Sequence, residues 1–201
     1  MKIDIRSLSE NQIIEFFEKK GFDSYRGRQV YEWIWKKSCY SFDEMTNISK
    51  DLRDVLNNHF IINHIQVDKI QKSSDGTIKN AVKLHDDHIV ESVLIPTDDR
   101  TTACVSSQVG CSLDCRFCAT SKLKRMRNLN PDEIYDQVVT INNQSLKYFN
   151  RPLSNIVYMG MGEPLMNFNN LIKSIEKITS DKGLNMSQKR IVVSTSGIPK
   201  M

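Results

Sequence analysis

The hydrophobic positions of residues 1–60 recur at helical spacing, which predicts a run of short helices. Ser9 and Gln12 form a capping box ahead of the first apolar stretch, and Gly21 is expected to end that helix. The second helix places its apolar residues on one broad face, as a helix packed on one side does. The four predicted helices begin near Ser9, residue 25, Ser41 and Ser49.

Between residues 65 and 95 the apolar positions alternate, which predicts three β-strands. Asp75-Gly76 is a typical hairpin turn, and Asp86-Asp87 is expected to form a second one. Strands joined by such short turns pair in opposite directions. The segment is therefore predicted to form a short antiparallel sheet that bridges the helices to the C-terminal part of the chain.

From Thr101 onward, strand patterns alternate with helical ones, and Asn130-Pro131 with Glu133 is typical of a helix start. Alternation of this kind predicts an α/β fold with a parallel sheet and right-handed crossovers. The strands are expected over about 101–107, 155–159 and 190–194, with a second helix over about 169–180. The predicted domains are a helical accessory domain at 1–62, an antiparallel β linker at 63–98 and an α/β part at 99–201.

Composition excludes several classes of protein. The chain is 39% hydrophobic and 26% charged, as ordinary soluble globular proteins are. Its sequence has no apolar run long enough for a membrane span and no signal-peptide core at the N-terminus. Five cysteines, mostly clustered, do not suggest a secreted disulfide framework. We therefore expect a cytoplasmic protein with no membrane association.

The net charge of +4 is unevenly distributed along the chain. The segment Lys122–Arg127, KLKRMR, holds four basic residues and no acidic one, and such a run attracts a phosphate backbone. Taken alone, the run is as well explained by a solvated loop. The helical region offers further candidate phosphate contacts, although a purely packed helical cap explains that region equally well: Arg26, Arg28, Lys36 and Lys37.

The candidate functional residues are concentrated between Cys104 and Cys118, in the segment CVSSQVGCSLDCRFC. Cys111, Cys115 and Cys118 form a C-x3-C-x2-C array, and thiolates this close together suit a soft metal or an iron–sulfur cluster. The compact array supplies three ligands, so a four-iron cluster would keep one iron open for a small molecule. The alternative is a zinc site that takes Cys104 as its fourth ligand.

The array has an aromatic residue, Phe117, before its last cysteine, and MGMGEPLMN at 159–167 and STSG at 194–197 come after it in the chain. In this order the motifs resemble those of the RlmN/Cfr family of radical S-adenosylmethionine (radical SAM) RNA methyltransferases, and the RlmN branch more than the Cfr branch. The resemblance extends over nearly the whole chain. It implies a partial, incomplete TIM-type barrel, preceded by a small helical domain that positions RNA and by the short antiparallel sheet. In such barrels the chemistry lies at the C-terminal ends of the strands, where all three motifs are expected.

The resemblance also implies cofactors. Cys111, Cys115 and Cys118 would ligate a [4Fe-4S] cluster whose open iron takes the amino and carboxylate groups of S-adenosylmethionine (SAM). Gly162 and Glu163 match the family's SAM-amino motif, and a carboxylate beside an ammonium makes a charge-assisted pair. Ser194 matches a family position that contacts SAM. Without the family resemblance, the Gly-Glu-Pro motif and Ser194 would be interpreted as ordinary turn or cap residues.

Two further residues receive roles only through the resemblance. Glu91, thirteen residues before Cys104, matches the family's general base, which takes the proton from the adenine carbon. Cys104 matches the thiol that resolves a covalent protein–RNA adduct by attack on sulfur. In the family, that adduct forms when a 5′-deoxyadenosyl radical abstracts a hydrogen atom from the S-methyl group of a methylated cysteine and the resulting carbon radical adds to adenine. Without the family, Glu91 would be an outward-facing strand residue and Cys104 a small core residue.

The methyl-carrying cysteine of the family lies beyond residue 201, and Cys39 is better explained as a core residue than as its substitute. We therefore expect the chain to lack the C-terminal half of the enzyme and not to methylate RNA by itself. The implied reaction is methylation of adenine C2 in 23S rRNA and tRNA, with a flavodoxin-like electron donor and a monomeric protein. The alternatives are a Cfr-type enzyme acting at adenine C8 and a non-catalytic zinc/RNA-binding module.

Overall fold

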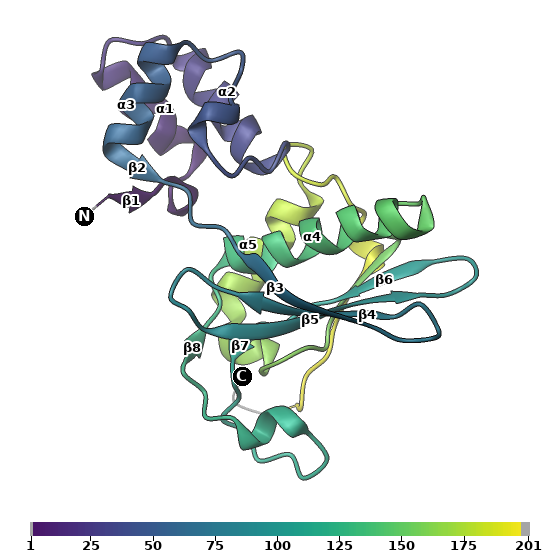
Figure 1. The fold of residues 1–201 in the computed structure, drawn as a ribbon. Helices are drawn as coiled ribbons and strands as arrows, with labels where there is room; N and C mark the ends of the chain where they lie inside the picture. The colour runs from purple at the N-terminus through teal and green to yellow at the C-terminus, as the bar shows by residue number, and fades with distance from the viewer. Residues whose placement is uncertain (1, 198–201) are drawn as a thin grey trace. The chain divides into compact units, whose positions relative to one another are not determined.

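The computed structural model describes residues 2–197 and divides the chain into two compact units. The helical unit comprises Met1–His64 and Thr179–Asn185, and the sheet unit comprises Ile65–Ile178 and Met186–Met201 (Figure 1). Each unit has its own hydrophobic core. The division into three domains drawn from the sequence stays a prediction.

The helical unit is built from three α-helices and one short parallel strand pair. Ser9 accepts a hydrogen bond from the backbone N–H of Gln12, whose side chain accepts one from the Ser9 N–H in return. The predicted third helix is only a 3₁₀ turn, because Phe42 and Met45 both turn into the core and Met45 leaves helical geometry. The elements are β1 (Ile3–Asp4), α1 (Glu10–Lys19), α2 (Ser24–Trp35), the 3₁₀ turn Phe42–Glu44, α3 (Lys50–His59) and β2 (Phe60–Ile61).

The sheet unit contains a six-stranded sheet in the order β10-β9-β6-β5-β4-β3 among the described residues. β6, β9 and β10 are parallel, and β3, β4 and β5 are antiparallel to their neighbours. The elements are β3 (Gln66–Lys72), β4 (Ile78–Lys83), β5 (Ile89–Pro96), β6 (Thr101–Cys104), β7 (Gln108–Val109), β8 (Arg127–Asn128), α4 (Pro131–Phe149), β9 (Asn155–Tyr158), α5 (Phe168–Thr179) and β10 (Ile191–Val193).

The predicted antiparallel sheet is therefore not separate from the parallel one. β5 pairs with β6, with Val93 opposite Cys104, so the two predicted sheets form one continuous sheet. Pairing with β6 satisfies the hydrogen bonds along one edge of β5, which would otherwise be an open sheet edge.

One face of the sheet carries the core, and α4 and α5 cover it. On β4 and β5 the buried positions alternate with more exposed ones, as a half-covered sheet requires. Asn80 of β4 and Gln144 of α4 exchange two side-chain hydrogen bonds of 3.0 and 2.7 Å, and Tyr158 of β9 is bonded to Ser174 of α5 at 2.8 Å. The opposite face carries Glu91.

Among residues 2–197, no helix combines the length and the hydropathy needed to span a bilayer.

Candidate functional site

The three segments singled out in the sequence come directly after three adjacent parallel strands. The cysteine segment follows β6, the GMGEP segment follows β9, and the STSG segment follows β10. Parallel strands end at the same edge of a sheet, so the segments lie together there. Two hydrogen bonds join neighbouring ends: the Ser107 N–H donates to the Met161 carbonyl at 2.9 Å, and the Ser196 N–H donates to the Glu163 carboxylate at 2.8 Å.

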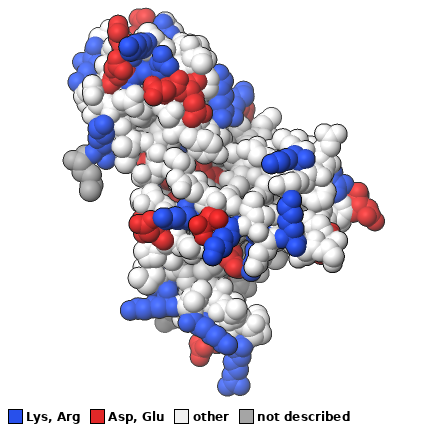
Figure 2. Space-filling model, in the orientation of Figure 1, with Lys and Arg blue, Asp and Glu red and all other residues white. Residues whose placement is uncertain are grey.

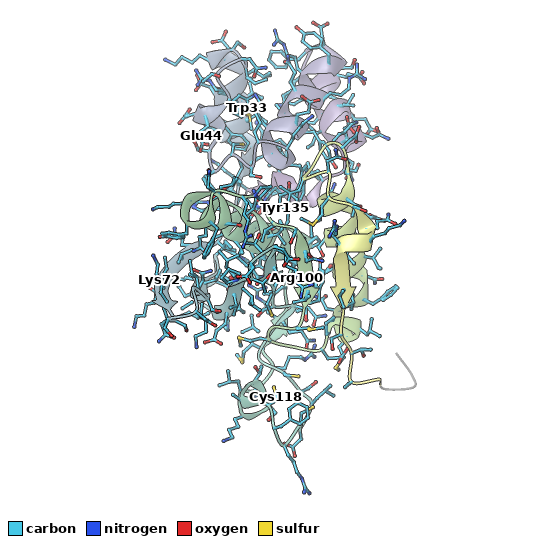
Figure 3. The ribbon with its side chains drawn as sticks, turned by 90° about the vertical axis from the view of Figure 1, so that its right-hand side faces the viewer. Trp33, Glu44, Lys72, Arg100, Cys118 and Tyr135 are labelled. Atoms are coloured by element: carbon cyan, nitrogen blue, oxygen red, sulfur yellow. The ribbon has the colours of Figure 1, made fainter. Side chains whose placement is uncertain are left out.

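Cys111, Cys115 and Cys118 lie in a loop, residues 110–126, that is closed at its base by pairing of β7 with β8. We call it the cysteine loop. Gly110 adopts φ +72°, and a Cβ there would lie 2.3 Å from the Lys124 carbonyl oxygen, so the base of the loop is tightly packed. Figure 3 shows Cys118 on this loop, at the end of the unit away from α4. The base of the loop is thus held by close backbone contacts.

The donor chemistry of the loop fits an iron–sulfur cluster. Cys111, Cys115 and Cys118 are free, half-buried thiols on one short segment, and the Leu113 N–H donates to the Cys111 sulfur at 3.5 Å. Nevertheless, among residues 2–197 no three His, Cys, Asp or Glu side chains are gathered as a ready metal site. The ligand assignment from the sequence therefore remains a prediction.

The base of the loop is anchored by an ion-pair cluster. The Arg127 guanidinium makes two 2.8 Å bonds to the Glu133 carboxylate and one of 2.6 Å to Asp86. The hydrogen bond from Arg127 holds the pKa of the Asp86 carboxyl well below the usual range of an aspartate, although burial acts to raise that pKa. Glu133 also caps α4 through the Asn130 N–H. The end of the cysteine loop is therefore bound to both α4 and the β4–β5 turn.

Glu163 is the best-defined charged group of the site. Its side chain accepts from the backbone N–H groups of Leu165 at 3.1 Å and Ser196 at 2.8 Å, and the residue is 4% exposed. Burial raises the pKa of the carboxyl, but these hydrogen bonds and those from the Thr195 and Ser196 side chains outweigh it, so the net pKa is lowered. Glu163 is thus held as a carboxylate at neutral pH.

Glu91 and Cys104 lie on one face of the sheet. Val93 is directly opposite Cys104, and Glu91 is two residues from Val93, so alternation places all three side chains on the face away from α4. Glu91 forms a half-exposed 3.0 Å ion pair with Lys79. Burial raises the pKa of the Cys104 thiol, with a smaller opposing effect from a backbone hydrogen bond of Met159. Cys104 is therefore a protonated thiol at neutral pH.

Ser194 is exposed at the end of β10. The residue that reaches the GMGEP segment is Ser196, two positions further on. Other polar residues at this edge were not recognised in the sequence, where polar side chains just beyond a strand or within a turn are typical of exposed loops. They are nevertheless buried, each 3% exposed or less: Ser106, Ser107, Gln108 and Asn167.

The five cysteines are predicted to differ in reactivity. Burial, followed by the nearby Glu44, raises the pKa of Cys39 to about 12 from 9.0, so its thiolate fraction at pH 8 is about a thousandfold lower than that of an ordinary thiol. When the metal-free chain is treated with iodoacetamide, we expect peptides containing the loop cysteines to be labelled first, Cys104 later and Cys39 only on unfolding. Mass spectrometry of a time course measures this order. Labelling of Cys39 as fast as Cys115 would contradict the burial argument.

Two protein families match the chain. The ribosomal RNA large subunit methyltransferase N-terminal domain matches residues 3–62, and the radical SAM superfamily matches residues 105–200. Residues 105–200 are therefore a radical SAM domain, and an rRNA-methyltransferase-type domain precedes it. The second match includes the cysteine loop, the GMGEP segment and β10.

Similar proteins extend this result over the whole chain. A probable dual-specificity RNA methyltransferase RlmN from Christiangramia forsetii is 70% identical over 100% of this chain and 57% of its own. A dual-specificity RNA methyltransferase RlmN from Desulfotalea psychrophila is 42% identical over 98% of this chain and 56% of its own. The crystal structure of a radical SAM methyltransferase from Sphaerobacter thermophilus is 34% identical, with a TM-score of 0.86 over 98% of this chain and 57% of that one.

The chain is thus homologous to proteins named RlmN, and it spans slightly more than half of the length of these relatives. The family resemblance and the predicted fold class, a partial radical SAM α/β domain preceded by helices, are confirmed.

Proposed function

We propose that this chain carries the cluster-binding and SAM-binding part of a radical SAM methyltransferase that methylates C2 of adenine in 23S rRNA and tRNA. The observation that carries the proposal is the meeting of three motifs at one sheet edge. The cysteine loop, the buried Glu163 carboxylate and the end of β10 all lie there, within a domain that matches the radical SAM superfamily. The relatives' names support RNA as the substrate.

In this proposal Cys111, Cys115 and Cys118 hold a [4Fe-4S] cluster, which together with SAM supplies the radical chemistry when both are bound. Glu163 receives the ammonium group of SAM, since it is a carboxylate held in place by two backbone N–H groups. Ser194 contributes a hydroxyl from the neighbouring strand end. The protein's part is to fix these groups before the substrate binds.

Glu91 and Cys104 are proposed to act on the RNA. Both lie on the face of the sheet away from α4, so a base placed against that face could meet a carboxylate and a thiol together. Glu91 would accept the proton from the adenine carbon. Cys104 would become a nucleophile only after losing its proton, because burial favours the thiol form.

The RNA is proposed to contact basic side chains of the cysteine loop. Lys122, Lys124 and Arg125 are all exposed, and Lys and Arg side chains gather over this end of the sheet unit in Figure 2. We propose in addition that the protein acts in the cytoplasm as a monomer and takes its electron from a flavodoxin-like donor.

The test is anaerobic reconstitution of the chain with iron and sulfide. We expect a brown protein with about four irons and four sulfides per chain, as a [4Fe-4S] cluster requires, and a change in its electron paramagnetic resonance spectrum on addition of SAM. A colourless protein that holds zinc tightly and excludes iron would overturn the proposal and favour a zinc-stabilised RNA-binding module.

A further inference from the structure

Gln108 lies between the two halves of the proposed cofactor site. Its side chain is completely buried at the base of the cysteine loop, where Gln108 begins β7 directly after two buried serines, Ser106 and Ser107. A buried primary amide must satisfy both its carbonyl oxygen and its amino group. Gln108 does so by bonding to a different motif at each end.

The carbonyl end of Gln108 holds the carboxylate-bearing turn. Its Oε1 accepts a 2.9 Å hydrogen bond from the backbone N–H of Glu163. The backbone approach is so close that a Cβ at Gly162 would lie 2.5 Å from the Gln108 Cβ. The peptide between Gly162 and Glu163 is therefore fixed directly against this side chain.

The amino end of Gln108 holds the far end of the cysteine loop. Its Nε2 donates to Asn128 Oδ1 at 2.7 Å, and the two residues are also directly opposite in the β7–β8 pair. Asn128 Oδ1 accepts a second, longer bond from Arg125 at 3.3 Å. Asn128 Nδ2 donates to the Met166 carbonyl at 3.2 Å, on the turn just after Glu163.

We propose that Gln108, acting through Asn128, is a positioning residue that sets the cysteine loop against the Glu163 turn, so that a cofactor can contact both at once. The inference rests on the proposed function and deepens it. Gln108 does not touch the cofactor; it fixes two groups that would. Its two bonds cannot both be kept if the amide is reversed, because the amino group would then face the Glu163 N–H and the oxygen would face Asn128 Oδ1.

The matched control is a second pair of hydrogen-bonded side-chain amides in the sheet unit, Asn80 and Gln144. Gln144 exchanges two hydrogen bonds with Asn80 and lies on the helix-covered side of the sheet, away from the strand ends. Gln108→Met and Gln144→Met each remove one buried amide and its two side-chain hydrogen bonds, which leaves the Glu163 N–H without Gln108 in the first variant and the Asn80 amide without Gln144 in the second. The two substitutions should cost similar stability, but only the first should disturb the site.

The experiment compares both variants with the wild-type chain. After reconstitution, Gln108→Met should keep the iron content of the wild type, since the three loop cysteines are intact. Its affinity for SAM, measured by equilibrium dialysis, should fall about 10- to 100-fold, by analogy with the cost of removing a group that orients metal ligands. Gln144→Met should keep SAM affinity within twofold. A Gln108→Met chain that binds SAM as the wild type does, or a Gln144→Met chain that loses as much, would overturn the proposal.

Hydrogen exchange of the metal-free chains separates this inference from the proposed function. Gln108→Met should speed hydrogen exchange both in peptides covering 110–128 and in peptides covering 159–167. Gln144→Met should leave the exchange of both sets of peptides unchanged. If the wild type takes up no iron and no SAM, the proposed function fails while this coupling is still measured. Unchanged exchange in both peptides would refute the positioning role whatever the cofactor result.

Discussion

Replacing Cys118 by serine is expected to reduce the iron content of the reconstituted chain to about a tenth of the wild-type value or less. If Cys118 is a cluster ligand, as proposed, removing it should cost more than removing an outer-shell partner, which already costs about 10- to 100-fold in metal affinity. Cys111→Ser and Cys115→Ser should behave in the same way. Iron and sulfide are measured on anaerobically reconstituted protein after desalting, together with the visible absorption of the cluster.

The chain supplies its own controls. Cys39 is buried in the helical unit, and Cys104 lies on β6, outside the cysteine loop. Cys39→Ala and Cys104→Ala should therefore retain the full iron content. If Cys104→Ala lost the metal as completely as Cys118→Ser, a four-cysteine site would be the better description, and zinc would become the favoured metal.

Local signals in the sequence were sufficient to predict the elements that position the site. The capping boxes at Ser9 and Asn130 place the starts of α1 and α4 correctly, because both depend on side chains three residues apart. The alternation of strands and helices after Thr101 was sufficient to predict that the three motifs lie at one edge, since parallel strands end together. A local pattern and a topological rule thus gave the outline of the site.

The contacts that bind the site together were not predictable in the same way. Gln108 bonds to Asn128 and Glu163, at sequence separations of 20 and 55 residues, and no periodicity relates such positions. The text SSQ has polar residues where a strand ends, which is typical of a loop, yet all three side chains are buried. Tertiary packing determines that burial. The pairing of β5 with β6 was not predictable from the sequence pattern either, and it joins two sheets that were predicted separately.

Ser194 and Ser196 show that the sequence pattern does not identify which residue at a strand end makes a contact. The pattern predicts where β10 ends but not which of the next residues turns toward the neighbouring strand end. The structure leaves Ser194 exposed and directs the Ser196 N–H to Glu163. A shift of two residues depends on the backbone turn after the strand, and a sequence of small polar residues permits several such turns.

Gly162→Ala is expected to destabilise the sheet unit strongly for the addition of a single methyl group. Gly162 has φ +97°, which costs an L-residue about 1–2 kcal/mol, and its Cβ would lie 2.5 Å from Gln108 Cβ and 2.9 Å from the Gln108 backbone nitrogen. Overpacking against such a fixed neighbour adds about 1–3 kcal/mol. We expect a total loss of about 3 kcal/mol and a fall of about 10 °C in the melting temperature of the sheet unit.

Gly76→Ala separates the two causes of this loss. Gly76 has a similar φ of +86° in the same unit, but a Cβ there would meet only side-chain atoms, at 3.2 Å and beyond. It should therefore cost about 1–2 kcal/mol, the conformational part alone. Circular dichroism follows both variants, and fluorescence provides an internal reference because both tryptophans, Trp33 and Trp35, lie in the helical unit. Equal destabilisation by the two substitutions would mean that the turn can move away from Gln108, and the close contact between them would then not be what fixes Glu163.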